Sequence, residues 1–161
     1  MPNILTAVLI LSLAPISMAH EFDLPLGAED ELIVEGPIEV HLVYSPNYSL
    51  SFDKQRVQVN RDGRRVTIVS EQPTVINLEV PNLKSLAVTD GQLMILLEGN
   101  ERLRLQRLDA PEIRVRLNDR ARLTAESMLT EHLQILLSDQ GKASIDFVKA
   151  NLLELTMQDH G

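Results

Sequence analysis

The chain contains no cysteine and no tryptophan, and it has only three phenylalanines and two tyrosines. Without cysteine, disulfide bonds, thiolate metal sites and thiol catalysis are excluded. The scarcity of aromatic rings argues against a sugar-binding cleft, because such sites generally stack sugar rings on aromatic faces. Positive charge is also in the minority: the formal net charge is −8, which makes nucleic acid and anionic membrane surfaces poor partners.

Long apolar runs are confined to the beginning of the chain. Residues 4–13 form an apolar core, and Ser17-Met18-Ala19 then places small residues at the two positions that a signal peptidase reads. We therefore expect residues 1–19 to be a cleaved signal peptide and the protein to be exported, to the periplasm, the cell surface or the medium. The segment lacks the usual Lys or Arg before its apolar core, which keeps a retained N-terminal anchor as the alternative.

From residue 81 onward the apolar pattern repeats every twenty residues. The alternating positions are Leu93, Ile95 and Leu97, then Ile113, Val115 and Leu117, then Leu133, Ile135 and Leu137, then Leu153, Leu155 and Met157. Three more columns keep the interval: Leu83, Leu103, Leu123 and Ala143; Val88, Leu108, Met128 and Val148; and the turn formers Gly99, Asp119, Asp139 and Asp159. Repeats this short bury their apolar faces only by stacking on one another, so the pattern predicts a solenoid.

Alternation within each repeat favours strands over helices. The sequence therefore predicts an all-β, single-domain parallel β-helix, a β-solenoid with about 20 residues per rung, over residues 81–161. The inward positions go out of step between Leu105 and Leu108, which predicts a bend there. A leucine-rich horseshoe is the less favoured alternative, because it needs a helix or loop after each strand, whereas a second apolar strand follows each corner here.

Residues 22–80 alternate in the same way but lack the twenty-residue interval. Strands are expected at residues 31–34, 38–44 and 48–52, and Asp62-Gly63 between two alternating runs is a strong β-hairpin signal. We expect this half to be an antiparallel N-terminal cap module that closes one end of the solenoid. The mature chain, residues 22–161, is then one domain.

The junction between the two halves carries a family resemblance. Val34-Glu35-Gly36, an alternating strand, a hairpin and then Leu78-Glu79-Val80-Pro81-Asn82-Leu83-Lys84-Ser85-Leu86 resemble the auto-transporter adhesin head GIN domain family, over roughly residues 22–161. Members usually turn at each corner with Ser-Gly-Ser-Gly, whereas this chain has turn formers such as Thr89-Asp90-Gly91 and Asn118-Asp119-Arg120. The resemblance implies an exported bacterial protein with a stacked β-solenoid fold and an adhesin-like role, and it implies no catalytic residues.

The aspartate column invites a chemical interpretation. Asp119, Asp139 and Asp159 are expected about 4.8 Å apart along one edge, a spacing that suits calcium binding or a pair of glycosidase carboxylates. The favoured interpretation is structural: each aspartate caps its corner through a side chain to backbone hydrogen bond. Histidine chemistry is no better supported, because His41, His132 and His160 have no serine in a nucleophile elbow and no ligand-like spacing. We predict no catalytic residue, no cofactor and no metal.

Outward positions provide the candidate contact surface. The second complete rung is rich in arginine, and Arg104, Arg114 and Arg116 fall in outward columns, where a basic band would bind acidic glycans or another negatively charged partner. The alternative is neutralisation by nearby glutamates such as Glu112. Apolar residues also occupy outward positions at Met94, Leu96 and Leu136, as a contact surface would require. These six residues form the predicted contact surface.

The function expected from these features is binding or assembly at the cell envelope, adhesin-like and without catalysis. The alternatives are a polysaccharide-processing enzyme on a β-helix scaffold and a calcium-stabilised surface repeat. The partners expected are a second copy of the chain, an envelope protein or a glycan. The exposed solenoid face is one contact site. The other is the last rung, which is expected to present an open edge after Met157.

Overall fold

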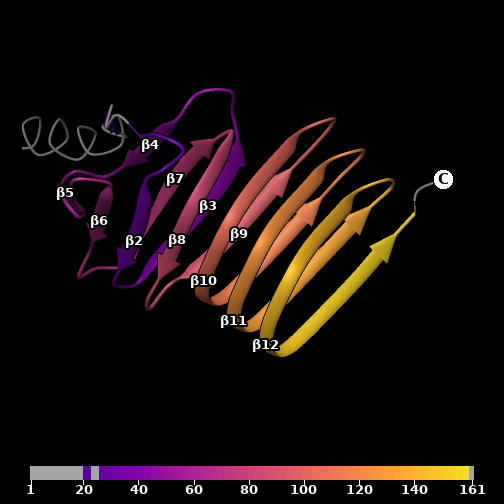
Figure 1. Ribbon diagram of the computed structural model, residues 1–161. Coiled ribbons are helices and arrows are strands. Elements are labelled where there is room, and N and C mark those ends of the chain that lie inside the picture. Colours follow the sequence, from indigo (N-terminus) through magenta and orange to yellow (C-terminus); the bar gives the residue numbers. More distant parts are fainter. Residues whose placement is uncertain (1–19, 23–25, 160–161) are drawn as a thin grey trace, which may run out of the picture.

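The computed structural model describes residues 20–22 and 26–159, and its regular elements form one 12-stranded, curled sheet (Figure 1). The strands are β1 (His20–Phe22), β2 (Glu31–Glu35), β3 (Ile38–Tyr44), β4 (Ser49–Phe52), β5 (Gln58–Asp62), β6 (Arg65–Val69), β7 (Thr74–Val80), β8 (Asn82–Val88), β9 (Gln92–Leu97), β10 (Arg102–Leu117), β11 (Arg122–Ser138) and β12 (Lys142–Gln158). The all-β class is as expected. The predicted signal peptide, residues 1–19, lies outside the described residues, and within them no helix is long and apolar enough to cross a membrane.

The sheet is folded over so that it has two walls. β10, β11 and β12 each bend back on themselves (Figure 1), and the strand pairing skips Gln106 and Pro111 in β10, which marks the bends. The first wall contains β6, β2, β8 and the early segments of β10 to β12. The second wall contains β7, β3, β9 and the late segments. The bend predicted between Leu105 and Leu108 is present, and both leucines are buried.

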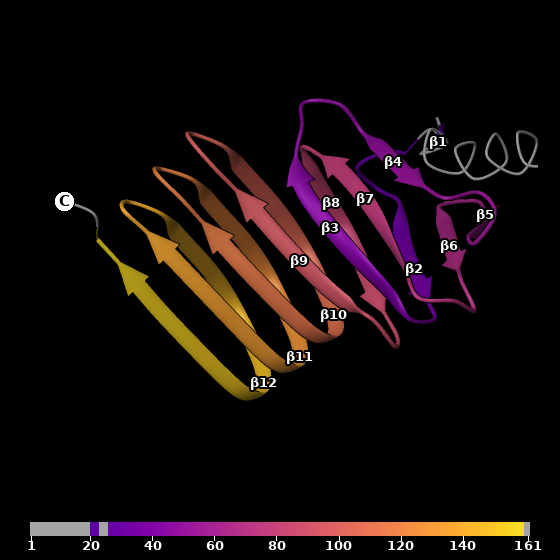
Figure 2. The same ribbon diagram turned by 180° about the vertical axis from the view of Figure 1, so that it is seen from behind.

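Strands at the same level of the two walls form a layer, and six layers are stacked in parallel. In order they are β6–β7, β2–β3, β8–β9, β10, β11 and β12. Buried aliphatic side chains from both walls form one hydrophobic cluster, because alternate residues of each strand point inward. The antiparallel strands β4 and β5 lie at one end of the stack, and β12 lies at the other (Figure 2).

The twenty-residue interval is the pairing register of the later layers. Leu103 pairs with Leu123, and Leu123 with Ala143. The predicted turn column is also present: Gly99, Asp119 and Asp139 all have a left-handed backbone, with φ of 60°, 58° and 57°. The Asp119 carboxylate accepts a hydrogen bond of 3.1 Å from the Gly99 amide of the layer before. Asp119 therefore acts as a turn residue that ties adjacent layers together.

Two predicted columns are wrong by two residues at β8. Leu83 pairs with Leu105 rather than Leu103, and Leu86 takes the place expected for Val88, opposite Leu108. The reason is the corner between β8 and β9. Thr89, Asp90 and Gly91 form a separate bend there, whereas β10 runs as one strand through the equivalent corner. The first repeat therefore has additional residues at this corner.

The expectation of an antiparallel N-terminal cap module is also wrong for most of its strands. β2 pairs in parallel with β6 and β8, and β3 pairs in parallel with β7 and β9. Only the β1–β4, β4–β7 and β5–β6 pairs are antiparallel, and the last is the predicted Asp62-Gly63 hairpin. The β2–β3 layer is inserted between β6–β7 and β8–β9, because its apolar faces continue the core columns on both sides.

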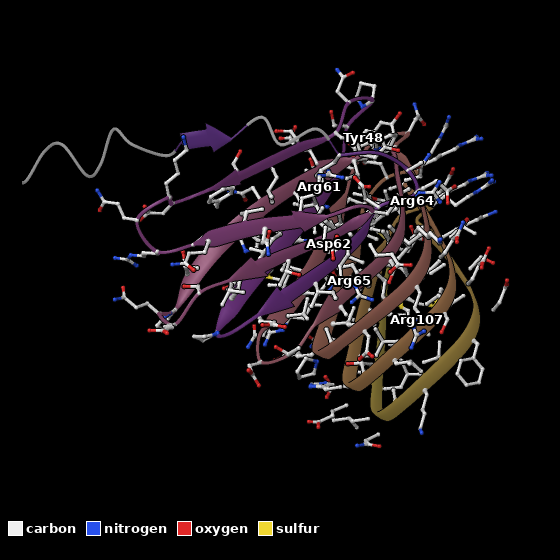
Figure 3. The ribbon with its side chains drawn as sticks, turned by 60° about the vertical axis from the view of Figure 1, so that its left-hand side comes forward. Tyr48, Arg61, Asp62, Arg64, Arg65 and Arg107 are labelled. Atoms are coloured by element: carbon white, nitrogen blue, oxygen red, sulfur yellow. The ribbon has the colours of Figure 1, made fainter. Side chains whose placement is uncertain are left out.

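A partly buried ion pair fastens the β5–β6 hairpin to the stack. Asp30 is only 6% exposed, and its carboxylate accepts hydrogen bonds from Arg61 at 3.1 Å and from the Gly27 amide at 2.8 Å. Figure 3 labels Arg61, Asp62, Arg64 and Arg65 on this hairpin. Burial acts to raise the pKa of Asp30, but the bonds from Arg61 and Gly27 outweigh it, so this pKa lies below its ordinary value of 3.8.

This pair predicts a specific acid sensitivity. A lowered folded-state pKa contributes stability that is present above the ordinary value and is lost as the pH falls through the folded-state value, hence below about pH 4. Asp30→Asn should lower the free energy of unfolding at neutral pH by about 2 kcal/mol and should flatten the loss of stability in acid. Urea unfolding at pH 7 and pH 3 measures both effects. If variant and wild type lose the same stability between those pH values, Asp30 is not the responsible group.

Candidate functional site

The outward face of the second wall carries the candidate site. Because side chains alternate along each strand, the residues between the buried core positions of β9 to β12 point away from the core. The strand register stacks them in columns. One column contains Val43, Leu96, Arg116, Leu136 and Thr156, so apolar side chains flank a single arginine in an otherwise polar face.

Four members of this column, Leu96, Arg116, Leu136 and Thr156, help to line a groove with a volume of about 320 Å³. Its lining consists of Met94, Ile95, Leu96, Arg114, Val115, Arg116, Gln134, Leu136 and Thr156. We call this feature the outer groove. Leu96 is 40% exposed, and Met94 and Leu136 beside it are half-buried.

Two arginines give the outer groove its charge. The Nε atom of Arg114 donates to Glu112 at 2.7 Å, so its charge is partly compensated within its own strand. Arg116 is exposed and forms no ion pair or hydrogen bond with any other side chain in residues 26–159. The guanidinium of Arg116 therefore retains its donors and its charge for an external acceptor.

The outer groove is bordered by polar contacts that hold the neighbouring column in place. Glu154 of β12 lies 3.0 Å from His132 Nε2 and accepts a bond of 3.3 Å from the Gln134 amide. These contacts run between β11 and β12 along the outer surface. They hold the Glu154 carboxylate against His132 and Gln134. Glu154 therefore does not neutralise the charge of Arg116 in the groove.

The structure unites five of the six predicted contact residues and separates the sixth. Met94, Leu96, Arg114, Arg116 and Leu136 all line the outer groove. Arg104 lies before the bend of β10, in the segment that pairs with β8, whereas Arg114 and Arg116 lie in the segment that pairs with β9. The expected band of three arginines is therefore split between the two walls. Gln134 and Thr156 were not predicted, because a polar residue at an outward position carries no distinguishing signal.

The remaining candidates lie apart from this groove. Asp119 and Asp139 occupy left-handed turns, and Asp159 follows the end of β12. His41 contacts Glu39 of its own strand at 2.8 Å, and His132 contacts Glu154. Within the described part of the chain, no three histidine, aspartate or glutamate side chains converge as a metal site would require. His160 lies outside the described residues.

The described residues form an all-β protein of stacked layers with an outer groove on the second wall. No family model matches the chain, and no curated protein matches it. Similarity is found to solved structures. A "putative adhesin" from Parabacteroides distasonis is 11% identical over 87% of this chain and 78% of its own, with a TM-score of 0.38.

Two further solved structures are similar to this chain, one of them with a lower TM-score. A "putative cell adhesion protein" from Clostridium sporogenes is 8% identical over 83% of this chain and 94% of its own, with a TM-score of 0.38. A "putative adhesin" from Bacteroides fragilis is 10% identical over 87% of this chain and 96% of its own, with a TM-score of 0.28. The candidate site itself is defined by the residues of this chain alone.

Proposed function

We propose that this chain is an exported, non-enzymatic binding protein of the cell envelope, adhesin-like, and that its layers are the turns of a parallel β-solenoid. The observation that carries the proposal is the outer groove, where Arg116 stands unpaired between Leu96 and Leu136. The twenty-residue pairing register supports the solenoid, and the apolar segment 4–13 with Ser17-Met18-Ala19 supports export.

The lining favours binding over catalysis. Its outward side chains belong to Met, Leu, Arg, Gln and Thr, and none of these exchanges a proton readily at neutral pH. Acid–base catalysis needs a group that titrates near the working pH. An apolar floor with a fixed positive charge instead suits recognition of a complementary surface.

The partner that fits best is an extended protein segment that presents a carboxylate between aliphatic side chains. The aliphatic groups would cover Met94, Leu96 and Leu136, and the carboxylate would accept the donors of Arg116. A glycan fits less well, because the lining contains no aromatic ring for a sugar to stack on. An envelope protein is therefore the class of partner proposed.

A charge reversal tests this proposal with a matched control. The probe is a synthetic peptide with the core Leu-Ser-Glu-Ser-Leu, which places leucine, glutamate and leucine on one face of an extended strand. Arg116→Glu should weaken binding of this peptide at least about tenfold, because it replaces an ion pair with repulsion. Arg104→Glu makes the same charge change on the other wall and should alter the affinity less than about twofold. Fluorescence anisotropy measures both affinities.

A second peptide with lysine in place of glutamate completes the design. The wild-type protein should bind it at least about tenfold more weakly than the glutamate peptide. Two results would reject the proposal: equal losses for Arg116→Glu and Arg104→Glu, which would indicate attraction to overall charge, or equal affinities for the two peptides.

A further inference from the structure

The last layer exposes the apolar side chains that every other layer buries. Eight large hydrophobic residues are exposed in the described chain, and six of them lie in β12. They are Phe147, Val148, Leu152, Leu153, Leu155 and Met157, with exposed fractions from 38% to 74%. Leu153 and Leu155 continue the columns that are buried as Leu133 and Ile135 in β11, and Met157 follows the half-buried Leu137.

Two outward positions of β12 are also apolar, although the same positions are polar in the layers before it. Phe147 follows Arg107 and Ser127 in its column, and Leu152 follows Glu112 and His132. If β12 were simply the end of the stack, that position would explain why its inward side chains are exposed, but it would not explain why its outward side chains are apolar. In these two columns the change from polar to apolar occurs at β12, and it widens the apolar surface around the open edge.

From this surface we infer that β12 is an interface between two copies of the chain, which meet end to end through antiparallel pairing of their β12 strands. β12 pairs with β11 on one side, and no described strand lies on the other, so its outer backbone donors and acceptors have no strand partner. A second β12 related by a two-fold axis supplies the complementary groups, because a two-fold contact brings the same surface together from both copies.

The other end of the stack restricts how two copies meet. There β5 pairs with β6 along its whole length and β4 pairs with Asn77, Leu78 and Glu79 of β7, so most of the first layer's edge is already covered. Among the described strands, the longest unpaired edge that a second copy offers is therefore its own β12. This geometry closes a dimer and disfavours an open chain of copies.

Size and charge are both compatible with a stable contact. A strand of 17 residues that rises about 3.3 Å per residue, with side chains spanning roughly 10 Å, presents a footprint on the order of 500 Å². Two copies would then bury about 1,000 Å², the area at which specific interfaces begin. The charges of β12 are Lys142, Lys149, Asp146 and Glu154, so this strand is neutral in a chain of net charge −8. Two copies therefore meet without net repulsion at this surface.

Sedimentation velocity of the purified protein across the micromolar range tests the inference. The wild type should pass from monomer to a discrete dimer as the concentration rises. Leu155→Lys should raise the dimer dissociation constant at least about tenfold, because it places a charge in the apolar centre of the contact. Leu155 is 57% exposed, so the monomer should tolerate lysine. Leu96→Lys makes the same change in the outer groove and should leave the dimer intact.

Hydrogen exchange gives a second readout that does not depend on a variant. Amides of β12 should exchange more slowly in concentrated than in dilute wild-type protein, while those of β10 should not change. A wild type that stays monomeric at high micromolar concentration, assemblies that grow beyond the dimer, or a dimer that survives Leu155→Lys would each overturn the inference. Because Leu96→Lys alters the outer groove alone, loss of peptide binding and loss of the dimer are separable results.

Discussion

Gly91→Val is expected to destabilise the protein by at least about 3 kcal/mol, because Gly91 lies where the β8–β9 corner touches the backbone of the next layer. A Cβ atom on Gly91 would lie 1.7 Å from the carbonyl oxygen of Ile38 and 2.7 Å from its carbonyl carbon. Ile38 begins β3, whose pairing with β9 holds the two layers together. A backbone carbonyl in a paired strand has no room to move, so the layers would have to separate.

The matched control is Gly27→Val. A Cβ atom on Gly27 meets no atom within 4 Å, and its backbone is not left-handed, so this substitution should change the free energy of unfolding by less than about 0.5 kcal/mol. Chemical denaturation followed by circular dichroism compares the two variants. A Gly91→Val protein as stable as Gly27→Val would mean that the corner does not approach Ile38 as described.

The second large expected effect is a difference in the free-energy cost of leucine-to-alanine substitution between two positions of the same column. Leu133 in β11 is fully buried, whereas Leu153, its partner in β12, is 56% exposed. Leu133→Ala should cost about 3–4 kcal/mol, because it removes buried methyl groups and leaves a cavity. Leu153→Ala should cost less than about 1 kcal/mol in the monomer, because the side chain loses little contact with the core.

The expected cost of Leu153→Ala depends on the protein concentration, whereas that of Leu133→Ala does not. Unfolding is measured first in dilute protein, where the monomer dominates, and then in concentrated protein, where a contact through β12 would add to the cost of Leu153→Ala. The cost of Leu133→Ala should be the same in both. Equal costs for the two substitutions in dilute protein would show that β12 is not the exposed end of the stack.

The layered arrangement of β10 to β12 follows from the sequence, because pairing at an interval of twenty residues aligns apolar columns and turn residues together. Two features do not follow from it. The extra residues at Thr89-Asp90-Gly91 shift the register of β8. Asp90-Gly91 marks a turn in the sequence, but turn residues do not show how many residues the corner adds relative to the later layers. The insertion of β2–β3 between two later layers depends on contacts far apart in sequence, which alternation alone does not specify.

The candidate site was predictable to the extent that it depends on the same register. One column contains Leu96, Arg116 and Leu136 because these residues lie twenty positions apart. Met94 lies two positions before Leu96 and therefore points to the same outward side. Arg104 was misplaced for a physical reason. Alternation shows whether a side chain points in or out, but it does not show on which wall an outward residue lies. The bends of β10 lie between Arg104 and the pair Arg114 and Arg116, so these arginines lie on different walls.

If the outer groove is the binding surface, titration with the Leu-Ser-Glu-Ser-Leu peptide should change the methyl and amide chemical shifts of its lining. We expect the largest shifts at Met94, Leu96 and Leu136, together with the backbone amide of Arg116. Shifts centred on the first wall around Arg104, on the β5–β6 hairpin or on β12, or the absence of any shift at saturating peptide, would contradict it.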